Sequence, residues 1–486
     1  MKAIHNSKFL IFNSKLIIQN SKLIIQNSKL FTAFKPFRWL KVIRNSSFVI
    51  FFRLPFLLFP LALLLFTSCP EPTPPDYGLS LEAVDIVCTE ATFKVSAGID
   101  STSAWDCGLY RDDSLVISQS ISGGVGYLRD TGLEPNASYN YHIGYLKKGK
   151  AKDRSQVVNI TTLDTTSSSF AWSEEHIFDE PCDFFGIRFR TVDIVSDDNI
   201  WIGGAFCDND SFYNVTHWDG SQWTYYNTTD KSRTHFDFPV FDIQFFNENN
   251  IWMLHEGSPA FYNGESTFRY RFYQDYPNLP HHGINTLWGS APDDVWFGAY
   301  AGAIYHWDGE TFHYIHSGTD MTIWDMDGTS DGTVYLVAYS TDGNEGIGSC
   351  LIRIKDNIPE IVWESDQGSE LIARINIVED VPYLTSNSGL MMYLPQTGQL
   401  FKLADYEDYP KLTSFLRVCG PSRNDLIVVS SRMAIYHYNG KQFRYIYGYY
   451  HPDRRIFDFD YNGNIIIGGG LYQLWAPAFF LGYRNK

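Results

Sequence analysis

Short runs of alternating apolar and polar residues follow one another along the chain from residue 77 onward. Within residues 77–163 the runs LEAVDIV, TFKVSAG, CGLYRDD, SYNYHIGYL and VVNITTL are separated by turn residues. A period of two is typical of half-buried strands, and this spacing of strands and turns is typical of a β-sandwich. The pattern therefore predicts a small sandwich domain over residues 77–163, followed by a polar linker at residues 164–169.

An internal repeat occupies the rest of the chain. Residues 284–317 align without a gap with residues 415–448, at an offset of 131, so that AIYHWDG falls on AIYHYNG. Five weaker copies complete a set of seven units, whose first strands begin near Val192, Phe241, Ile284, Ile323, Ile375, Leu416 and Ile456. A four-stranded propeller blade needs about 40–45 residues, which matches the spacing of these units. We therefore predict a seven-bladed β-propeller over residues 170–486.

The strands of one blade can be assigned from the best copy. Residues 284–289 form the innermost strand, 294–300 the second and 303–307 the third, and Asp308-Gly309 turns the chain into the fourth strand at 311–317. Unit seven lacks a regular fourth strand, whereas residues 170–178 (FAWSEEHIF) resemble one and precede unit one. We expect this early segment to pair into unit seven, because such closure removes free sheet edges.

Two resemblances agree with these predictions. Pro292–Trp296 together with Ile304–Gly309 resembles the PDDVW and HWDG motifs of propeller repeats in exported bacterial lipoproteins. This resemblance implies a propeller but no particular reaction. In the first domain, Leu109–Asp112 and Asp130–Asn136 resemble fibronectin type III domains. That resemblance implies that Tyr139 is a corner tyrosine, hydrogen-bonded back to the loop that contains Leu133.

The N-terminal segment is typical of an export signal. Residues 48–68 are apolar apart from Arg53 and follow a basic stretch, so residues 1–68 are expected to be a helical signal segment. Leu65–Cys69 resembles a bacterial lipobox, although Phe66 departs from the aliphatic residue usual there. The resemblance implies cleavage before Cys69 and acylation of its thiol. An uncleaved transmembrane anchor is the alternative, because the apolar run is long enough to span a bilayer.

The segments on either side of this signal differ in character. Residues 69–76 join the lipidated cysteine to a proline-rich, extended tether. Asn-Ser-Lys recurs at residues 6, 13, 20 and 27. We interpret residues 1–44 as an extension from a start codon placed too early, and exclude them from the fold.

Charge and composition narrow the class of protein. Aromatic residues make up 16% of the chain, which is typical of all-β proteins. Residues 1–68 hold ten of the 38 basic residues and no acidic one, which leaves 28 basic against 55 acidic residues and a net charge of −27. So acidic a body repels nucleic acid. We expect a monomer in the cell envelope, held by its lipid at the outer membrane and facing the periplasm or the exterior.

Neither a metal site nor a cofactor is predicted. None of the seven cysteines are spaced as CxxC. Cys182 and Cys207 are the first candidate pair for a disulfide, because they are close in sequence, and Cys88 and Cys107 are the second, with buried free thiols as the alternative. His217, His306 and His437 recur at one repeat position, which favours a structural role. Asp458–Gly463 and Asp325–Gly328 look like the start of a calcium loop but lack its closing glutamate, so both are interpreted as hairpin turns.

The loops between blades are the candidate binding surface. Two of them are long and similar, and a third adds further rings. The candidate ligand-binding residues are Phe236, Phe238, Tyr273, Asp275, Tyr276, Tyr406, Asp408 and Tyr409. Exposed aromatic rings among carboxylates suit recognition of a protein or a glycan. The alternative is that these rings pack on neighbouring blades and anchor the loops.

No motif for catalysis stands out, because the chain has neither a GxSxG nucleophile turn nor a phosphate-binding glycine loop. We therefore expect a non-enzymatic binding or scaffold lipoprotein. The alternative is a carbohydrate-active hydrolase or lyase whose carboxylates come from distant blades. Acidic residues gathered at the central channel would favour the enzyme, whereas apolar or recurrent residues there would favour the binding protein.

Overall fold

The computed structural model describes residues 77–98, 103–173, 188–208, 211–230, 232, 238–255, 257–340, 348–365, 370–409, 415–430, 433–448, 454–472 and 476–485. The signal segment, Cys69 and the tether lie outside these residues. In the described part of the chain, no helix combines the length and apolarity needed to cross a membrane.

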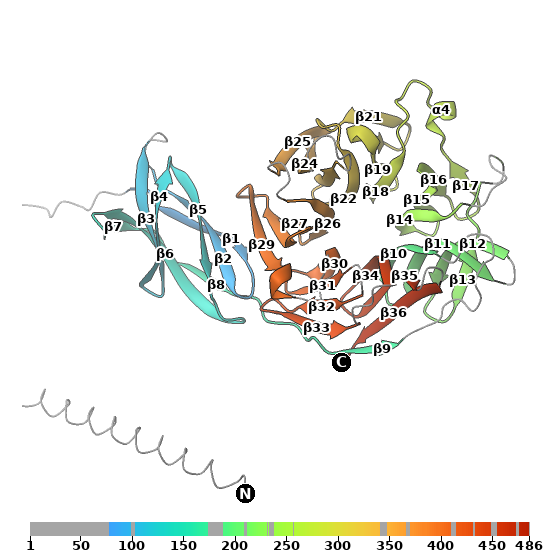
Figure 1. The fold of residues 1–486 in the computed structure, drawn as a ribbon. Helices are drawn as coiled ribbons and strands as arrows, with labels where there is room; N and C mark the ends of the chain where they lie inside the picture. Colours follow the sequence, from blue (N-terminus) through green and yellow to red (C-terminus); the bar gives the residue numbers. More distant parts are fainter. Residues whose placement is uncertain are drawn as a thin grey trace, which may run out of the picture. The chain divides into compact units, whose positions relative to one another are not determined.

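The first domain is a sandwich of two antiparallel sheets (Figure 1). One sheet has the order β1-β2-β5, with β1 at Ser80–Ile86, β2 at Glu90–Ser96 and β5 at Val125–Thr131. The other has the order β4-β3-β6-β7, and β8 also pairs with β6. Its strands are β3 (Ala104–Arg111), β4 (Ser114–Ser122), β6 (Ser138–Lys147), β7 (Lys150–Arg154) and β8 (Val158–Thr161).

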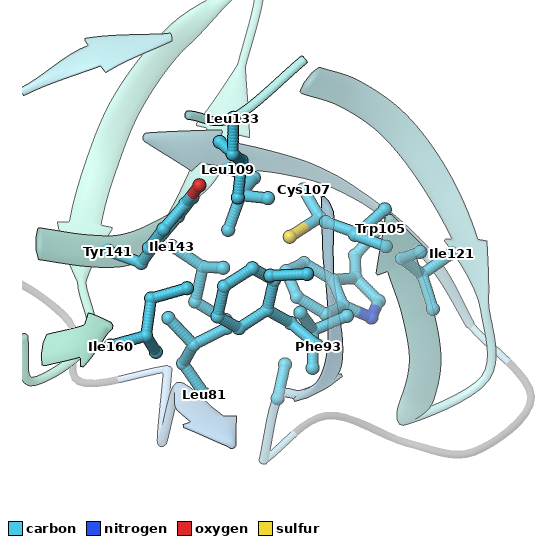
Figure 2. Close-up of a cluster of buried hydrophobic side chains, with 14 residues drawn as sticks. Leu81, Phe93, Trp105, Cys107, Leu109, Ile121, Leu133, Tyr141, Ile143 and Ile160 are labelled. Atoms are coloured by element: carbon cyan, nitrogen blue, oxygen red, sulfur yellow. The ribbon is translucent and has the colours of Figure 1, made fainter. Parts of the chain in front are cut away.

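The sandwich core lies between the two sheets. Figure 2 shows Phe93 of β2 facing Trp105 and Tyr141 of the opposite sheet, and all three side chains are at most 2% exposed. The Tyr139 hydroxyl accepts a hydrogen bond of 2.9 Å from the backbone N–H of Glu134, which follows Leu133. This is the contact that the corner-tyrosine resemblance implied.

The described strands after residue 169 form seven antiparallel four-stranded sheets. The first three comprise β10 (Arg188–Ser196), β11 (Asn199–Asp208), β12 (Ser211–Trp218) and β13 (Trp223–Tyr226); β14 (Val240–Asn247), β15 (Asn250–His255), β16 (Ser258–Tyr262) and β17 (Thr267–Arg269); and β18 (Ile284–Ala291), β19 (Asp294–Ala299), β20 (Ala303–Trp307) and β21 (Phe312–His316). The next two comprise β22 (Thr322–Gly328), β23 (Val334–Tyr339), β24 (Ser349–Lys355) and β25 (Ile358–Glu364); and β26 (Ile372–Val378), β27 (Val381–Ser386), β28 (Gly389–Leu394) and β29 (Gln399–Asp405). The last two comprise β30 (Phe415–Ser422), β31 (Asp425–Ser430), β32 (Ile435–Tyr438) and β33 (Phe443–Tyr447); and β34 (Arg454–Tyr461), β35 (Ile465–Tyr472), β36 (Ala476–Arg484) and β9 (Phe170–Ser173).

These sheets form a closed ring, which makes the domain a β-propeller (Figure 1). Each innermost strand contacts the innermost strand of the next sheet, and β34 contacts β10. Strand β9 pairs antiparallel with β36, so an early segment supplies the fourth strand of the last sheet. This pairing confirms for Phe170–Ser173 the closure that the sequence predicted; residues 174–178 lie outside the described residues.

Burial explains the pattern of the second strands. Every residue of β27 and of β31 is buried, as are five of the six in β19. A strand covered by neighbouring blades on both faces needs apolar residues at successive positions rather than at alternate ones.

The turn after β20 has the residues that the sequence analysis assigned to it. Gly309 has a φ of 90°, and the Asp308 carboxylate accepts the N–H groups of Glu310 and Thr311.

A polar contact joins the sandwich to the propeller. The guanidinium of Arg423, in the turn after β30, forms an ion pair with Asp85 of β1, and Nε donates to the Tyr383 hydroxyl at 3.2 Å. Both charged side chains are at most 10% exposed. At the surface, Lys441 pairs with Glu134 at 2.7 Å. The buried pair is the stronger constraint, because exposed pairs contribute little to stability.

Candidate functional site: the central cavity

A β-bulge occurs in every innermost strand of the ring. The pairing register shifts by one residue at Arg190, Phe241, Asn285, Trp324, Ala373, Leu416 and Phe457. A bulge adds one residue to a strand and re-aims the side chains around it. We call the residue at the shift the bulge position, the next residue the first wall position, and the residue two further on the second wall position.

Every wall position except Cys419 lines a cavity at the centre of the ring. Its volume is about 510 Å³, and side chains from all seven innermost strands line it. The residues between the two wall positions are buried in the hydrophobic clusters of the blades: Val192, Ile243, Leu287, Met326, Ile375, Val418 and Phe459. The period of two thus separates a polar cavity wall from an apolar blade core.

Carboxylates at the wall positions hydrogen-bond to the next blade. At the first wall position the acceptors are Asp242 to Leu287 N (3.0 Å), Asp325 to Ile375 N (2.9 Å) and Asp458 to Val192 N (3.2 Å). At the second they are Asp193 to Phe245 N (3.2 Å), Asp327 to Ile377 N (2.6 Å) and Asp460 to Ile194 N (2.8 Å). Gln244 makes the equivalent contact to Gly289 N at 3.4 Å. These side chains bridge adjacent blades, and two of them bridge the last blade to the first.

Burial shifts the pKa of these carboxyl groups upward. Desolvation, followed by the nearby Asp460 carboxylate, raises the pKa of Asp193 to about 7. Desolvation likewise raises the pKa of Asp242 to about 7 and that of Asp327 to about 6. Hydrogen bonds from backbone N–H groups oppose each shift without cancelling it.

Two arginines break the repeat. Arg374 and Arg417 occupy the first wall position of adjacent blades, where three other blades carry aspartate. Arg417 pairs with Asp458 at 2.5 Å, and its buried Nε has no hydrogen-bond partner among the residues that the structure describes. Arg374 lies 4.0 Å from Asp325 and donates to the Trp324 carbonyl at 3.2 Å.

Aromatic rings complete the cavity wall. The guanidinium of Arg190 lies between the rings of Phe241 and Phe457, 5.0 Å and 4.8 Å from their centroids. Phe241 is 39% exposed although it lies on an innermost strand. Trp288 and Trp324, from adjacent blades, also line the cavity, and both are half-buried.

The candidate residues of the first long loop have separate surroundings. Tyr276 packs edge-on against Phe312 at 5.2 Å and lies in a hydrophobic cluster. Tyr273, on the short helix α4 (Phe272–Asp275), is 59% exposed and lines a smaller pocket of about 200 Å³. The Asp275 carboxylate accepts the N–H of Arg271 at 2.8 Å.

The second long loop repeats this packing. Tyr409 contacts Tyr436 and Phe443 edge-on, at 5.7 Å and 5.4 Å, as Tyr276 contacts Phe312. Asp408 is exposed at the end of the 3-10 turn η3 (Tyr406–Asp408). The structure does not describe the side chain of Tyr406. In these loops Tyr276 and Tyr409 therefore fit the alternative that the rings anchor the loops.

The third loop is described only in part. The Phe238 ring lies 4.7 Å from the guanidinium of Arg269, whereas Phe236 falls outside the described residues. None of the candidate loop residues whose side chains the structure describes line the central cavity.

The three recurrent histidines have local partners. His306 Nε2 lies 2.7 Å from Asp294 Oδ1, and its ring stacks on Trp296 with centroids 3.9 Å apart. His217 repeats this arrangement with Asn199 and Trp201. His437 Nε2 lies 2.7 Å from Asp425, with Ile427 in the tryptophan position. Each histidine joins the second and third strands of its own blade.

The interpretation of two acidic motifs as hairpin turns was wrong for their aspartates, whereas Asn462 and Gly463 do lie in the hairpin turn between β34 and β35. Asp458 and Asp460 lie on β34, and Asp325 and Asp327 lie on β22, with their carboxylates at the cavity wall. A closely spaced pair of aspartates followed by glycine resembles a turn locally, whereas here the pairing with the second strand includes both aspartates of each motif. The signal that could have located the cavity was the aspartate shared by several first strands.

The cysteines and the metal-ligating side chains of the described residues were both compared with the predictions. Cys88, Cys107, Cys350 and Cys419 are free, buried thiols. Cys182 and the side chain of Cys207 fall outside the described residues, so their disulfide stays a prediction. No group of three or more His, Cys, Asp or Glu side chains there could hold a metal ion.

No protein-family model matches the chain, and no curated protein matches it. Among solved structures, one described as "YCF48 bound to D1 peptide" has a TM-score of 0.47 and 12% identity, covering 65% of this chain and 96% of that chain. The extracellular domain of the putative one component system BT4673 from B. thetaiotaomicron has a TM-score of 0.46 and 14% identity, covering 63% of this chain and 39% of that chain. The computationally designed Ika8 protein has a TM-score of 0.44 and 9% identity, covering 62% and 98%. These are similarities of fold only, and the chain itself is an all-β protein with a propeller-type domain.

Proposed function

We propose that the chain is an exported, lipid-anchored binding protein whose seven-bladed propeller holds its ligand in the central cavity. Leu65–Cys69 supports the anchor, and a fibronectin type III-like sandwich would separate the anchor from the propeller. The strand orders β1-β2-β5 and β4-β3-β6-β7, together with the Tyr139 hydrogen bond, support that assignment of the sandwich.

One observation carries the proposal for the cavity. Residues that the ring needs recur from blade to blade, as the bridging carboxylates do. Arg374 and Arg417 depart from that repeat, and together with Trp288 and Trp324 they face a cavity of about 510 Å³. Ligand sites are concave and combine apolar surface with a few polar groups. Side chains at such a place that the ring does not require are available for a ligand.

Binding is favoured over hydrolysis because the acidic residues have structural partners. Six wall aspartates come from four different blades, yet each accepts a backbone N–H of the next blade. A general acid and a nucleophile need carboxyl groups that can reach a substrate. The acidic residues are therefore both clustered and recurrent, and their recurrence supports the binding role.

The anchor is tested by changing Cys69→Ser in the full chain. In a bacterial host supplied with labelled palmitate, we expect the parent to take up label and to sediment with membranes, and the variant to lose the label. A variant that still carries label would contradict acylation at Cys69. A parent that sediments without label would favour the uncleaved transmembrane anchor.

Ligand binding is tested by capture with the full chain, solubilised in mild detergent and immobilised. Envelope and culture extracts are passed over the parent and over Arg374→Gln, with Tyr273→Ala as a matched surface control. We expect a component that the parent and Tyr273→Ala retain and Arg374→Gln releases. If all three proteins capture the same components, the cavity is not the binding site. If a captured glycan is shortened on incubation, the hydrolase alternative gains support.

A further inference from the structure

The polar side chains of the cavity wall include both hydrogen-bond donors and hydrogen-bond acceptors. Arg417 lies beside Asp458 and Arg374 beside Asp325, and the amide side chains of Gln244, Asn285 and Asn376 lie among them. Guanidinium groups only donate hydrogen bonds and carboxylates only accept them, whereas an amide does both. A ligand that fills this cavity must therefore offer both donors and acceptors over its whole surface. Hydroxyl groups meet that requirement, because each one donates once and accepts twice.

The balance of charge disfavours a strongly charged ligand. Six aspartates and three arginines line the cavity. Burial raises the pKa of Asp193, Asp242 and Asp327 to between about 6 and about 7, so the acidic excess is reduced near neutral pH. An anion would meet the remaining carboxylates, and a cation would meet the guanidinium groups. A neutral polar ligand avoids both penalties and leaves the existing ion pairs intact.

One donor of the wall lacks a partner. The Nε of Arg417 is buried and makes no hydrogen bond within the described residues, although the same guanidinium pairs with Asp458. Buried polar groups are almost always hydrogen-bonded, and an unpaired one calls for an acceptor. A hydroxyl oxygen in the cavity would satisfy this group.

The aromatic rings of the cavity wall suit the apolar face of a sugar ring. The carbon-bound hydrogens of a pyranose form an apolar face, while its hydroxyl groups lie around the rim. Trp288 and Trp324 line the cavity from adjacent blades, and both are half-buried. Aromatic rings combine a large apolar area with a defined orientation. A cavity of about 510 Å³ lies within the range of small-ligand sites and has room for about two sugar rings.

We infer that the central cavity binds a neutral saccharide, either a short oligosaccharide or the end of a longer chain. The inference rests on the proposed function, since it names the ligand class of the same cavity. Sugar hydroxyl groups would bond to Arg417, Arg374 and the amide side chains of the cavity wall. The apolar face of one ring would lie on Trp324 or Trp288.

The test is a printed array of neutral, uronic-acid and amino-sugar oligosaccharides, probed with the full chain in mild detergent. We expect signals on neutral members and none on their uronic-acid counterparts. The best neutral member is then titrated against the parent, Trp324→Ala, Arg374→Gln and Tyr273→Ala by calorimetry. The two cavity variants should bind roughly tenfold more weakly or worse, and Tyr273→Ala should match the parent.

The possible outcomes test two claims separately: that the ligand is a neutral saccharide, and that the ligand binds in the central cavity. Cavity-dependent binding of a charged glycan or of a protein would overturn the saccharide inference and leave the proposed function intact. Saccharide binding that is equal in all four proteins would overturn both, as would the absence of any ligand in both the array and the extract capture. Thermal unfolding of each variant shows whether it is folded, and ligand-induced stabilisation of the parent gives a measurement that needs no variant.

Discussion

At the scale of single residues, the same side-chain type has two uses in this ring. Aspartate at a wall position bridges blades, and arginine at the same position leaves that bridge out. Asp458 combines both situations, since Oδ2 accepts Val192 N at 3.2 Å while Oδ1 pairs with Arg417 at 2.5 Å. Only 5% of Asp458 is exposed, so its partners have little access to water. The residue thus holds the ring closed and positions a cavity guanidinium.

Changing Asp458→Ala should lower the free energy of unfolding by about 3 kcal/mol, because it leaves a guanidinium and a backbone N–H without their acceptor. Asp458→Asn keeps an oxygen for Val192 N and should cost clearly less. Urea unfolding of the two variants and the parent measures this difference. Equal losses in both variants would show that the bridge to Val192 contributes nothing measurable.

The buried carboxyl groups predict how stability depends on pH. Asp193 and Asp242 have folded-state pKa values of about 7, which are higher than the values in the unfolded chain. At a pH between the unfolded and the folded pKa, the folded protein therefore binds more protons than the unfolded chain does. The contribution of these two groups to the free energy of unfolding is complete below the unfolded pKa near 4, and it is lost as the pH rises through about 7. The melting temperature should therefore rise as the pH falls from about 8 to about 5.

The matched control replaces both groups with their neutral isosteres. The double variant Asp193→Asn/Asp242→Asn keeps the oxygen acceptors for Phe245 N and Leu287 N and removes the titration. Calorimetric melts should show a flatter pH dependence than in the parent. A parent whose melting temperature falls over the same range would contradict the raised pKa values.

Local sequence could predict some of these residue roles and not others. The histidines were interpreted as structural because they recur at one repeat position, and their contacts with Asp294, Asn199 and Asp425 agree with that role. Asp458 and Asp325 were misplaced because a short acidic motif before a glycine looks the same in a turn and at the end of a strand. The difference lies in the pairing of the next strand, which is a tertiary property.

At the scale of elements, the repeat alignment predicted the strands well. All seven expected first strands coincide with innermost strands, because an apolar run bounded by turn residues is a strong signal even in the weaker copies. The bulge beside the cavity-lining residues of each innermost strand could not be predicted, since one extra residue leaves no mark on an alternating pattern. The contents of the cavity wall were therefore hidden in the sequence.

Ring closure through β9 gives a prediction at this scale. Trp172 stacks on Tyr447 with centroids 4.1 Å apart and lies against Gly482 of β36. Trp172→Ala should lower the free energy of unfolding by about 2 kcal/mol, because it removes a half-buried ring from the closing strand. The exposed Tyr273→Ala should stay within about 0.5 kcal/mol of the parent. Chemical unfolding compares them, and equal stability of both variants would contradict a role of β9 in closure.

At the scale of the whole molecule, the described residues form a sandwich followed by a ring with a polar centre. The sequence predicted the order of these parts from residue 77 onward, because strand period, turn residues and the repeat are local signals. The sequence predicted the binding surface at the interblade loops. Two of the candidate rings there, Tyr276 and Tyr409, pack into hydrophobic clusters instead. The candidate site emerged only when seven distant strands were brought around one cavity.

The most direct test of this account measures where a bound ligand protects the chain. Hydrogen exchange of the full chain is compared with and without the ligand retained in the capture experiment. The account predicts slower exchange along the innermost strands β22, β26 and β30, around Trp324, Arg374 and Arg417, and unchanged exchange at α4 and η3. Protection confined to α4 and η3 would contradict the central cavity as the binding site and return the interblade loops to that role.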